Sequence, residues 1–118
     1  MVQFNETQPI FLQIRQRIIA LILNGVVKQD EALPSVRQVA GDLSVNPLTV
    51  TKAYQSLVDL GIIEKRRGLG MFVVNGARDK LLEHERDQFL NEEWPRIAER
   101  IEALGLSLET LIKKGSSK

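Results

Sequence analysis

Apolar residues recur every three or four positions near the start of the chain, which is the period of an amphipathic helix. The stripe consists of Ile10, Ile14, Ile18, Leu21 and Ile22. Pro9 stands just before it, and a first helical turn accepts proline because its amides have no intrahelical partner. Gly25 can adopt positive φ and end the helix. The pattern predicts a core-supporting helix between Pro9 and Gly25.

After a connection over residues 26–33, a second and shorter helical pattern begins at Ser35. Ser35 can cap the free amides while Gln38 reaches back to the cap, which is the arrangement of a capping box. The apolar face comprises Val36, Val39, Ala40 and Leu43. Arg37 lies in the first turn, where a cation is mildly unfavourable with respect to the helix dipole, and this suggests a partner outside the helix. A solvated arginine, or an ion pair with Asp42 or Glu64, remains an alternative.

Asn46 and Pro47 form the next helix start, as a capping residue followed by proline at the first helical position. The predicted helix runs to about Leu60 and stops at Gly61. Its inward face comprises Val50, Ala53, Tyr54, Leu57 and Leu60, and its outward face Thr49, Thr51, Lys52, Gln55 and Ser56. A helix that enters the major groove by its N-terminal end would present the first of these outward residues to bases and phosphates. An ordinary solvated helix face is the alternative.

Residues 62–67 and 71–74 have strand composition, and Gly68-Leu69-Gly70 between them predicts a hairpin. Three consecutive cations, Lys65 to Arg67, precede this turn and suit a phosphate backbone or a minor groove. The alternative is that the same run is only a charged strand edge that prevents aggregation. The order helix, turn, helix, hairpin favours a winged helix-turn-helix, and the predicted fold class is mainly α with a small β-wing.

From Ala77 the pattern is helical again, and Pro95 predicts a kink or break near Glu93-Trp94. Ser107 can cap a last short helix. This helical segment is too small to fold alone, so it needs a partner surface, either the first domain or a second copy. We expect domains at 1–75 and 76–118, the second serving dimerisation. Its expected interface residues are Leu82, Phe89, Leu90, Trp94, Ile97, Ile101, Leu104, Leu108 and Leu111.

The composition excludes several classes of function but does not identify a particular function. The 118 residues contain 43% hydrophobic residues, no cysteine and a net charge of +1, so disulfides and thiolate chemistry are excluded and a DNA-binding role must rest on local patches. We expect no membrane span, no signal peptide and a cytoplasmic location. The only histidine, His84, lies on a charged helix face, and no catalytic set or phosphate-binding motif is present. We expect neither an enzyme nor a cofactor or metal site.

Four separated motifs resemble the GntR family of bacterial transcription regulators. They are Pro9 to Ile14, Leu33 to Ala40, Val45 to Tyr54, and Gly61-Ile62-Ile63 with Arg66 to Val73. The short tail ending Leu104-Gly105-Leu106-Ser107 resembles the YtrA subfamily, whose small C-terminal part serves mainly dimerisation. The chain departs from the family at Gln29-Asp30, where a Pro-Gly turn is usual. At Thr51 some relatives carry arginine, which argues for a different operator sequence.

The resemblance implies a winged helix-turn-helix whose DNA contacts come from both helices and the wing. The principal contacts would be Arg37, Asn46, Thr49, Thr51, Arg67 and Gly68, and the weaker ones Ser35, Lys52, Tyr54, Arg66 and Gly70. The expected function is sequence-specific regulation of transcription, as a repressor that binds a palindromic operator in double-stranded DNA as a homodimer. No small-molecule effector is indicated by the sequence. The alternative is a winged helix used for protein interaction or replication without operator specificity.

Overall fold

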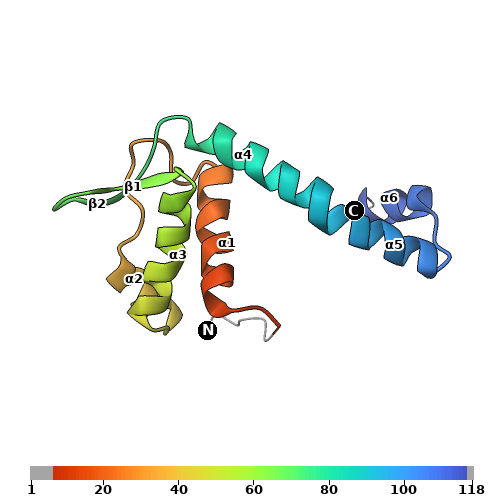
Figure 1. The fold of residues 1–118 in the computed structure, drawn as a ribbon, viewed down its shortest axis with the longest axis horizontal. Coiled ribbons are helices and arrows are strands. Elements are labelled where there is room, and N and C mark those ends of the chain that lie inside the picture. Colours follow the sequence, from red (N-terminus) through yellow and green to blue (C-terminus); the bar gives the residue numbers. More distant parts are fainter. Residues whose placement is uncertain (1–6, 117–118) are drawn as a thin grey trace. The chain divides into compact units, whose positions relative to one another are not determined.

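The computed structural model describes residues 7–116, which form two compact units, the first ending at Leu82 and the second beginning at Glu83. The outermost residues of the two expected domains, 1–6 and 117–118, lie outside this description. The elements in order are α1 (Ile10–Leu23), α2 (Val36–Leu43), α3 (Pro47–Asp59), β1 (Ile63–Arg66), β2 (Gly70–Val73), α4 (Ala77–Gln88), η1 (Phe89–Glu93), α5 (Trp94–Ala103) and α6 (Leu108–Ser116) (Figure 1). The predicted fold class, mainly α with a two-stranded wing, is confirmed.

Helices α1 and α3 lie side by side and contribute eight of the sixteen buried core residues in the described part of the first unit (Figure 1). The predicted stripe of α1 faces this core, where Ile14, Ile18 and Ile22 are buried, whereas Ile10 at its start is 43% exposed. The remaining core residues come from α1, α2, α3, the hairpin, the start of α4 and the connections before α2 and β1: Ile19, Leu33, Val39, Ala40, Val50, Ala53, Tyr54, Leu57, Ile62, Ile63, Val73, Ala77 and Leu81. Burial of these side chains fixes the angle at which α3 is presented.

The hairpin is antiparallel and its register pairs Ile63 with Val73 and Arg66 with Gly70. The edge of β2 that faces away from β1 also forms backbone hydrogen bonds. The amide of Asp30 donates to the carbonyl of Val73 (2.7 Å) and the amide of Leu33 donates to the carbonyl of Met71 (2.8 Å). Residues 30–33 therefore run along β2 on the side away from β1, where the sequence predicted only a connection.

The first unit extends to Leu82, beyond the end at residue 75 that the sequence predicted. Ala77 and Leu81 lie one helical turn apart at the start of α4, and both are buried in the core. Arg78 adds a polar link, because its Nε donates to the carbonyl of Leu23 at the end of α1 (2.9 Å). The beginning of α4 is thus a core element as well as the start of the tail.

The second unit contains the rest of α4 followed by η1, α5 and α6. The interruption predicted near Glu93-Trp94 takes the form of a π-helical turn, in which the amide of Trp94 donates to the carbonyl of Phe89. Pro95 has no amide to donate and its ring would clash with the carbonyl four residues earlier. A wider turn just before the proline accommodates both effects without breaking the helix.

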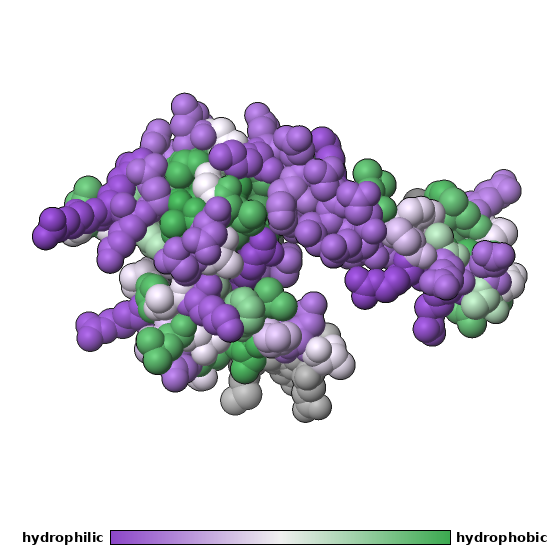
Figure 2. All heavy atoms as spheres, in the orientation of Figure 1, coloured by the Kyte–Doolittle hydropathy of each residue, from purple (hydrophilic) through white to green (hydrophobic). Residues whose placement is uncertain are grey.

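Apolar side chains are poorly covered within the second unit. Figure 2 shows hydrophobic surface among the hydrophilic residues of this part of the chain. Leu90 is 59% exposed and Leu104 is 58% exposed, and Phe89, Ile97 and Leu108 are also exposed. Trp94, Ile101 and Leu111 are half-buried, as is Leu82 at the end of the first unit. Across residues 7–116, no helix combines the length and apolar character needed to cross a membrane.

Candidate nucleic-acid interface

Two capped helix starts position the helix-turn-helix. The Oγ of Ser35 accepts a hydrogen bond from the amide of Gln38 (3.0 Å), and the Oδ1 of Asn46 accepts one from the amide of Leu48 (2.8 Å). Pro47 occupies the first turn of α3, as the sequence predicted. Each cap satisfies an amide that would otherwise lack a partner, and each fixes the residue from which its helix departs.

The start of α3 presents short polar groups to solvent. Asn46 and Thr51 are exposed, and Thr49 is half-buried. The hydroxyl of Thr51 donates to the carbonyl of Pro47 (3.0 Å), so its proton is used within the helix and its oxygen is left as an acceptor. The amide nitrogen of Asn46 has no partner among residues 7–116 and can donate two hydrogen bonds.

Arg37 and Lys52 bring positive charge to this face, in different ways. Arg37 is exposed and pairs with no carboxylate in the described part of the chain, so the predicted alternatives of Asp42 and Glu64 are not realised. The Nζ of Lys52 lies 4.1 Å from the centroid of the Phe11 ring on α1, a cation–π contact. Arg37 is therefore the less constrained of the two cations.

Tyr54 does not fit the direct DNA contact that the resemblance implied. Its side chain is 1% exposed and its hydroxyl donates to the carbonyl of Pro34. Burial raises the pKa of Tyr54 to about 12, so its hydroxyl stays protonated as a donor. Tyr54 ties α3 to the chain segment that leads into α2, and its role is to hold the two helices together.

The tip of the wing keeps the predicted arrangement. Arg67 and Gly68 lie in the turn between the strands and both are exposed. Gly68 has φ +76° and Gly70 has φ +110°, positive values that residues other than glycine rarely adopt. The backbone of the turn can thus approach a phosphate closely while Arg67 supplies the charge.

Arg66 differs from its two neighbours because it is already engaged within the protein. One terminal nitrogen lies 2.8 Å from the Oδ1 of Asp30, and its Nε lies 3.6 Å from the Oε2 of Glu64. Its guanidinium carbon lies 4.4 Å from the centroid of the Phe72 ring. The hydrogen bond to Asp30, and then the charge of Glu64, raise the pKa of Arg66 further above its ordinary value. The structure does not support the predicted DNA contact of this residue.

A groove of about 320 Å³ lies between the helix-turn-helix and the wing. Residues from α3, the hairpin and the start of α2 line it: Ser35, Val36, Thr51, Tyr54, Gln55, Lys65, Gly70 and Met71. Gln55 was not among the predicted contacts, and Lys65 was predicted only as one of the three cations of the wing that suit a phosphate backbone or a minor groove. Outward helical spacing from Thr51 could have identified Gln55, and strand alternation could have separated Lys65 from Arg66.

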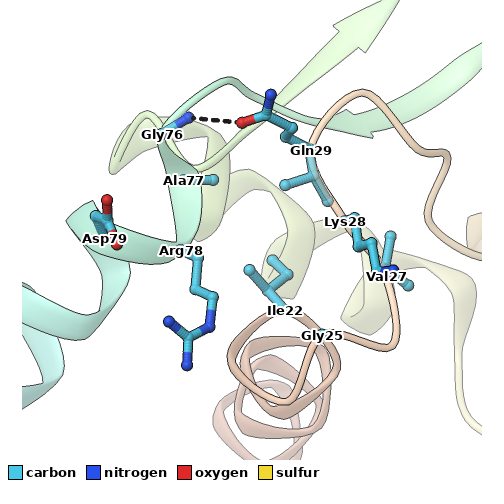
Figure 3. A pocket seen from close by; sticks show the side chains of 10 residues that line it. Ile22, Gly25, Val27, Lys28, Gln29, Gly76, Ala77, Arg78 and Asp79 are labelled. Carbon is cyan, nitrogen blue, oxygen red and sulfur yellow. Dashed lines mark hydrogen bonds between the residues drawn. The ribbon is translucent and has the colours of Figure 1, made fainter.

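A second cavity, of about 210 Å³, lies between the end of α1, the loop after it and the start of α4 (Figure 3). Ile22, Val73 and Ala77 contribute its apolar lining. The amide of Gly76 donates to the side chain of Gln29 across it (3.5 Å). This hydrogen bond links the loop after α1 to the start of α4.

Comparisons with known proteins agree with this geometry. Residues 11–73 match the family described as bacterial regulatory proteins, gntR family. The HTH-type transcriptional regulator YhcF of Bacillus subtilis is 32% identical over 111 residues, which are 94% of this chain and 90% of that protein. The HTH-type transcriptional repressor YtrA of the same organism is 44% identical over 75 residues, or 64% of this chain and 58% of YtrA.

The fold similarity extends over nearly the whole chain. A solved GntR family transcriptional regulator from Listeria monocytogenes superposes with a TM-score of 0.77 at 27% identity, and the alignment covers 98% of this chain and 99% of that one. The winged helix-turn-helix and the helical tail therefore occur together in a solved structure of similar length.

Proposed function

The chain belongs to the GntR family of bacterial regulatory proteins, and on this premise we propose that it is a transcriptional repressor that binds a palindromic operator as a homodimer. DNA binding and regulation of transcription come with the family. Repression is supported by the similarity to YtrA, which is named a repressor. A cytoplasmic site of action follows from a target on bacterial DNA.

The exposed N-terminal end of α3 is the observation on which the proposed DNA contact rests. Arg37, Asn46, Thr49 and Thr51 would contact the major groove, because α3 leads with short polar groups and with no acidic residue in its first turn. Arg67 and Gly68 would contact the backbone beside it. Ser35, Lys52 and Gly70 are secondary candidates. Ser35 and Lys52 already have partners within the protein.

Homodimerisation is proposed through the second unit. Exposed apolar residues such as Leu90 and Leu104 would be covered by the same residues of a second copy, an isologous contact with two-fold symmetry. Burying one large aliphatic side chain contributes about 1.5–3 kcal/mol. Two winged helices related by this symmetry would contact two half-sites, each presented in the opposite direction, which is the definition of a palindrome.

Selection of bound sequences from a random pool of double-stranded DNA tests the proposal. The full chain should recover an inverted repeat, and sedimentation should give the mass of a dimer. Leu90→Glu with Leu104→Glu should give a folded monomer that binds single half-sites weakly. Val26→Glu introduces the same charge at an exposed apolar position of the first unit and should leave the dimer intact.

Two results would contradict the proposal. If a folded dimer recovered no consensus sequence, the proposed operator specificity would be wrong. A doubly substituted variant that remains a dimer would place the contact between copies elsewhere in the chain.

A further inference from the structure

The three consecutive cations of the wing do not lie on the same face of the hairpin. The register pairs Lys65 with Met71 and Glu64 with Phe72. Because side chains alternate along a strand, Lys65 shares a face with Met71, and Arg66 shares the opposite face with Glu64 and Phe72. The charges of Lys65 and Arg66, which are adjacent in the sequence, therefore lie on opposite faces of the hairpin.

Lys65 faces the groove beside α3. It lines the groove together with Met71, Thr51 and Gln55, and its side chain is exposed. Its amine makes no ion pair in the described part of the chain. Thr51 and Gln55 are outward residues on consecutive turns of α3. The charge of Lys65 is thus available on the side of the wing where α3 presents its polar groups.

Arg66 instead joins three segments of the chain on the other face. From β1 its guanidinium lies over Phe72 of β2 and reaches Asp30 at the start of residues 30–33. Because those residues hydrogen-bond to the far edge of β2, the side chain of Arg66 spans the width of the sheet. Glu64 supplies a second, longer contact from the same strand.

Asp30 holds its end of this arrangement in an unusual conformation. Its φ is +65°, a left-handed value that aspartate tolerates better than most residues but that still carries a conformational cost. The amide of Asp30 is fixed by the carbonyl of Val73, and its carboxylate is fixed by Arg66. A glycine would accept the same φ but would have no carboxylate to offer.

We propose that Lys65 contacts the DNA backbone from the groove, whereas Arg66 is a positioning residue that fixes the wing through Asp30 and makes no contact with DNA. This inference rests on the proposed function, because it assigns the wing's charges to DNA binding. Arg67, in the turn beyond both strands, keeps its proposed backbone contact.

Three single substitutions in the full chain form a matched test, because Lys65→Ala, Arg66→Ala and Arg67→Ala each remove one positive charge from the same hairpin. Affinity for the selected operator is measured across a range of salt concentrations. Each lost phosphate contact reduces the slope of log affinity against log salt by about 0.9, so a substitution that removes one contact from each copy of the dimer should reduce it by about 1.8. This reduction is expected for Lys65→Ala, and Arg66→Ala should keep the wild-type slope.

Thermal unfolding supplies the second readout. Arg66→Ala and Asp30→Asn should both lower Tm, and the double variant should lose less than the sum of the two because they break the same contact. Lys65→Ala should leave Tm unchanged. If Arg66→Ala does not fold, Arg66→Lys tests the same point, since lysine keeps the charge but loses the planar fork and the stacking on Phe72.

A smaller slope for Arg66→Ala, or an unchanged slope for Lys65→Ala, would overturn the assignment. An unchanged Tm for Asp30→Asn would overturn the positioning role. Wild-type protein that binds DNA without salt dependence would instead contradict the proposed function itself, so the two failures are distinguishable.

Discussion

The hydroxyl of Tyr54 on α3 donates a hydrogen bond to the backbone carbonyl of Pro34, the residue before the cap of α2. This bond joins two positions 20 residues apart in the chain, and the side chain that makes it is 1% exposed. The two helices of the helix-turn-helix are therefore connected by a buried polar contact as well as by apolar packing. The contact fixes the positions of Ser35 and Arg37 relative to α3.

Tyr54→Phe is expected to lower the free energy of unfolding by about 1 kcal/mol, because the carbonyl of Pro34 loses its partner while the ring still fills the core. Urea denaturation measures the change. Affinity for the operator should fall by only a small factor, since Tyr54 acts through the position of α2 and of Arg37 on it. A loss of operator affinity as large as that of Arg37→Ala, in a variant that remains folded, would instead make Tyr54 a direct contact.

The raised pKa of the Tyr54 hydroxyl predicts that the protein loses stability in alkaline solution. Burial raises the pKa of Tyr54 to about 12, above its ordinary value of 10.0. A raised pKa stabilises the folded state fully below pH 10, and this contribution is lost as the pH rises from 10 to 12. At about 1.4 kcal/mol per pKa unit, the loss approaches about 3 kcal/mol.

Phenolate absorbance measures this titration directly, because the chain contains a single tyrosine. The midpoint should lie near 12 while the protein remains folded, and Tyr54→Phe should lack the alkaline loss of stability that is assigned to this group. A midpoint near 10 in folded protein would show that the hydroxyl is solvated.

The local signals of the helix starts and turns were sufficient to predict the winged helix-turn-helix. Ser35, Asn46 and Pro47 act at the helix starts where their chemistry places them, and the glycines at 68 and 70 adopt positive φ. Such features depend on residues within a few positions of one another. They are therefore readable from the sequence alone.

The differences between the predictions and the structure concern contacts between residues that are distant in sequence. Asp30 and Arg66 are 36 residues apart, so no local pattern indicated that the arginine was engaged. Tyr54 was predicted to face the core and also to contact DNA, and its buried bond to Pro34 decides for the core. The boundary at residue 75 missed Ala77 and Leu81, because a core helix that continues into a tail gives no break in periodicity.

Asn46 is predicted to have two separable roles. Its Oδ1 caps α3 and its amide nitrogen is free to donate to DNA. Asn46→Ser keeps a capping oxygen, whereas Asn46→Ala should lose about 1 kcal/mol of stability. Both variants lack the amide, so both should lose similar operator affinity in a binding titration although only the alanine variant loses stability. Full affinity in Asn46→Ser would reduce the residue to a helix cap.

Arg37 is predicted to contribute operator specificity. It is exposed in the first turn of α2 and forms no ion pair among residues 7–116, so removing it should leave the fold intact. If it contacts a base, Arg37→Ala should cost about 1–3 kcal/mol on the operator and much less on random DNA, as measured by competition binding.

Two further variants separate the possible causes of that loss. Arg37→Lys keeps the charge but not the planar fork that pairs with guanine, so it should also lose specificity while it retains the salt dependence of binding. Lys28→Ala removes an equal charge from an exposed position outside α2, α3 and the wing, and it should change operator affinity little. Equal losses on operator and random DNA in Arg37→Ala, with full recovery in Arg37→Lys, would assign Arg37 to a phosphate, because a phosphate requires the charge and not the shape of the side chain.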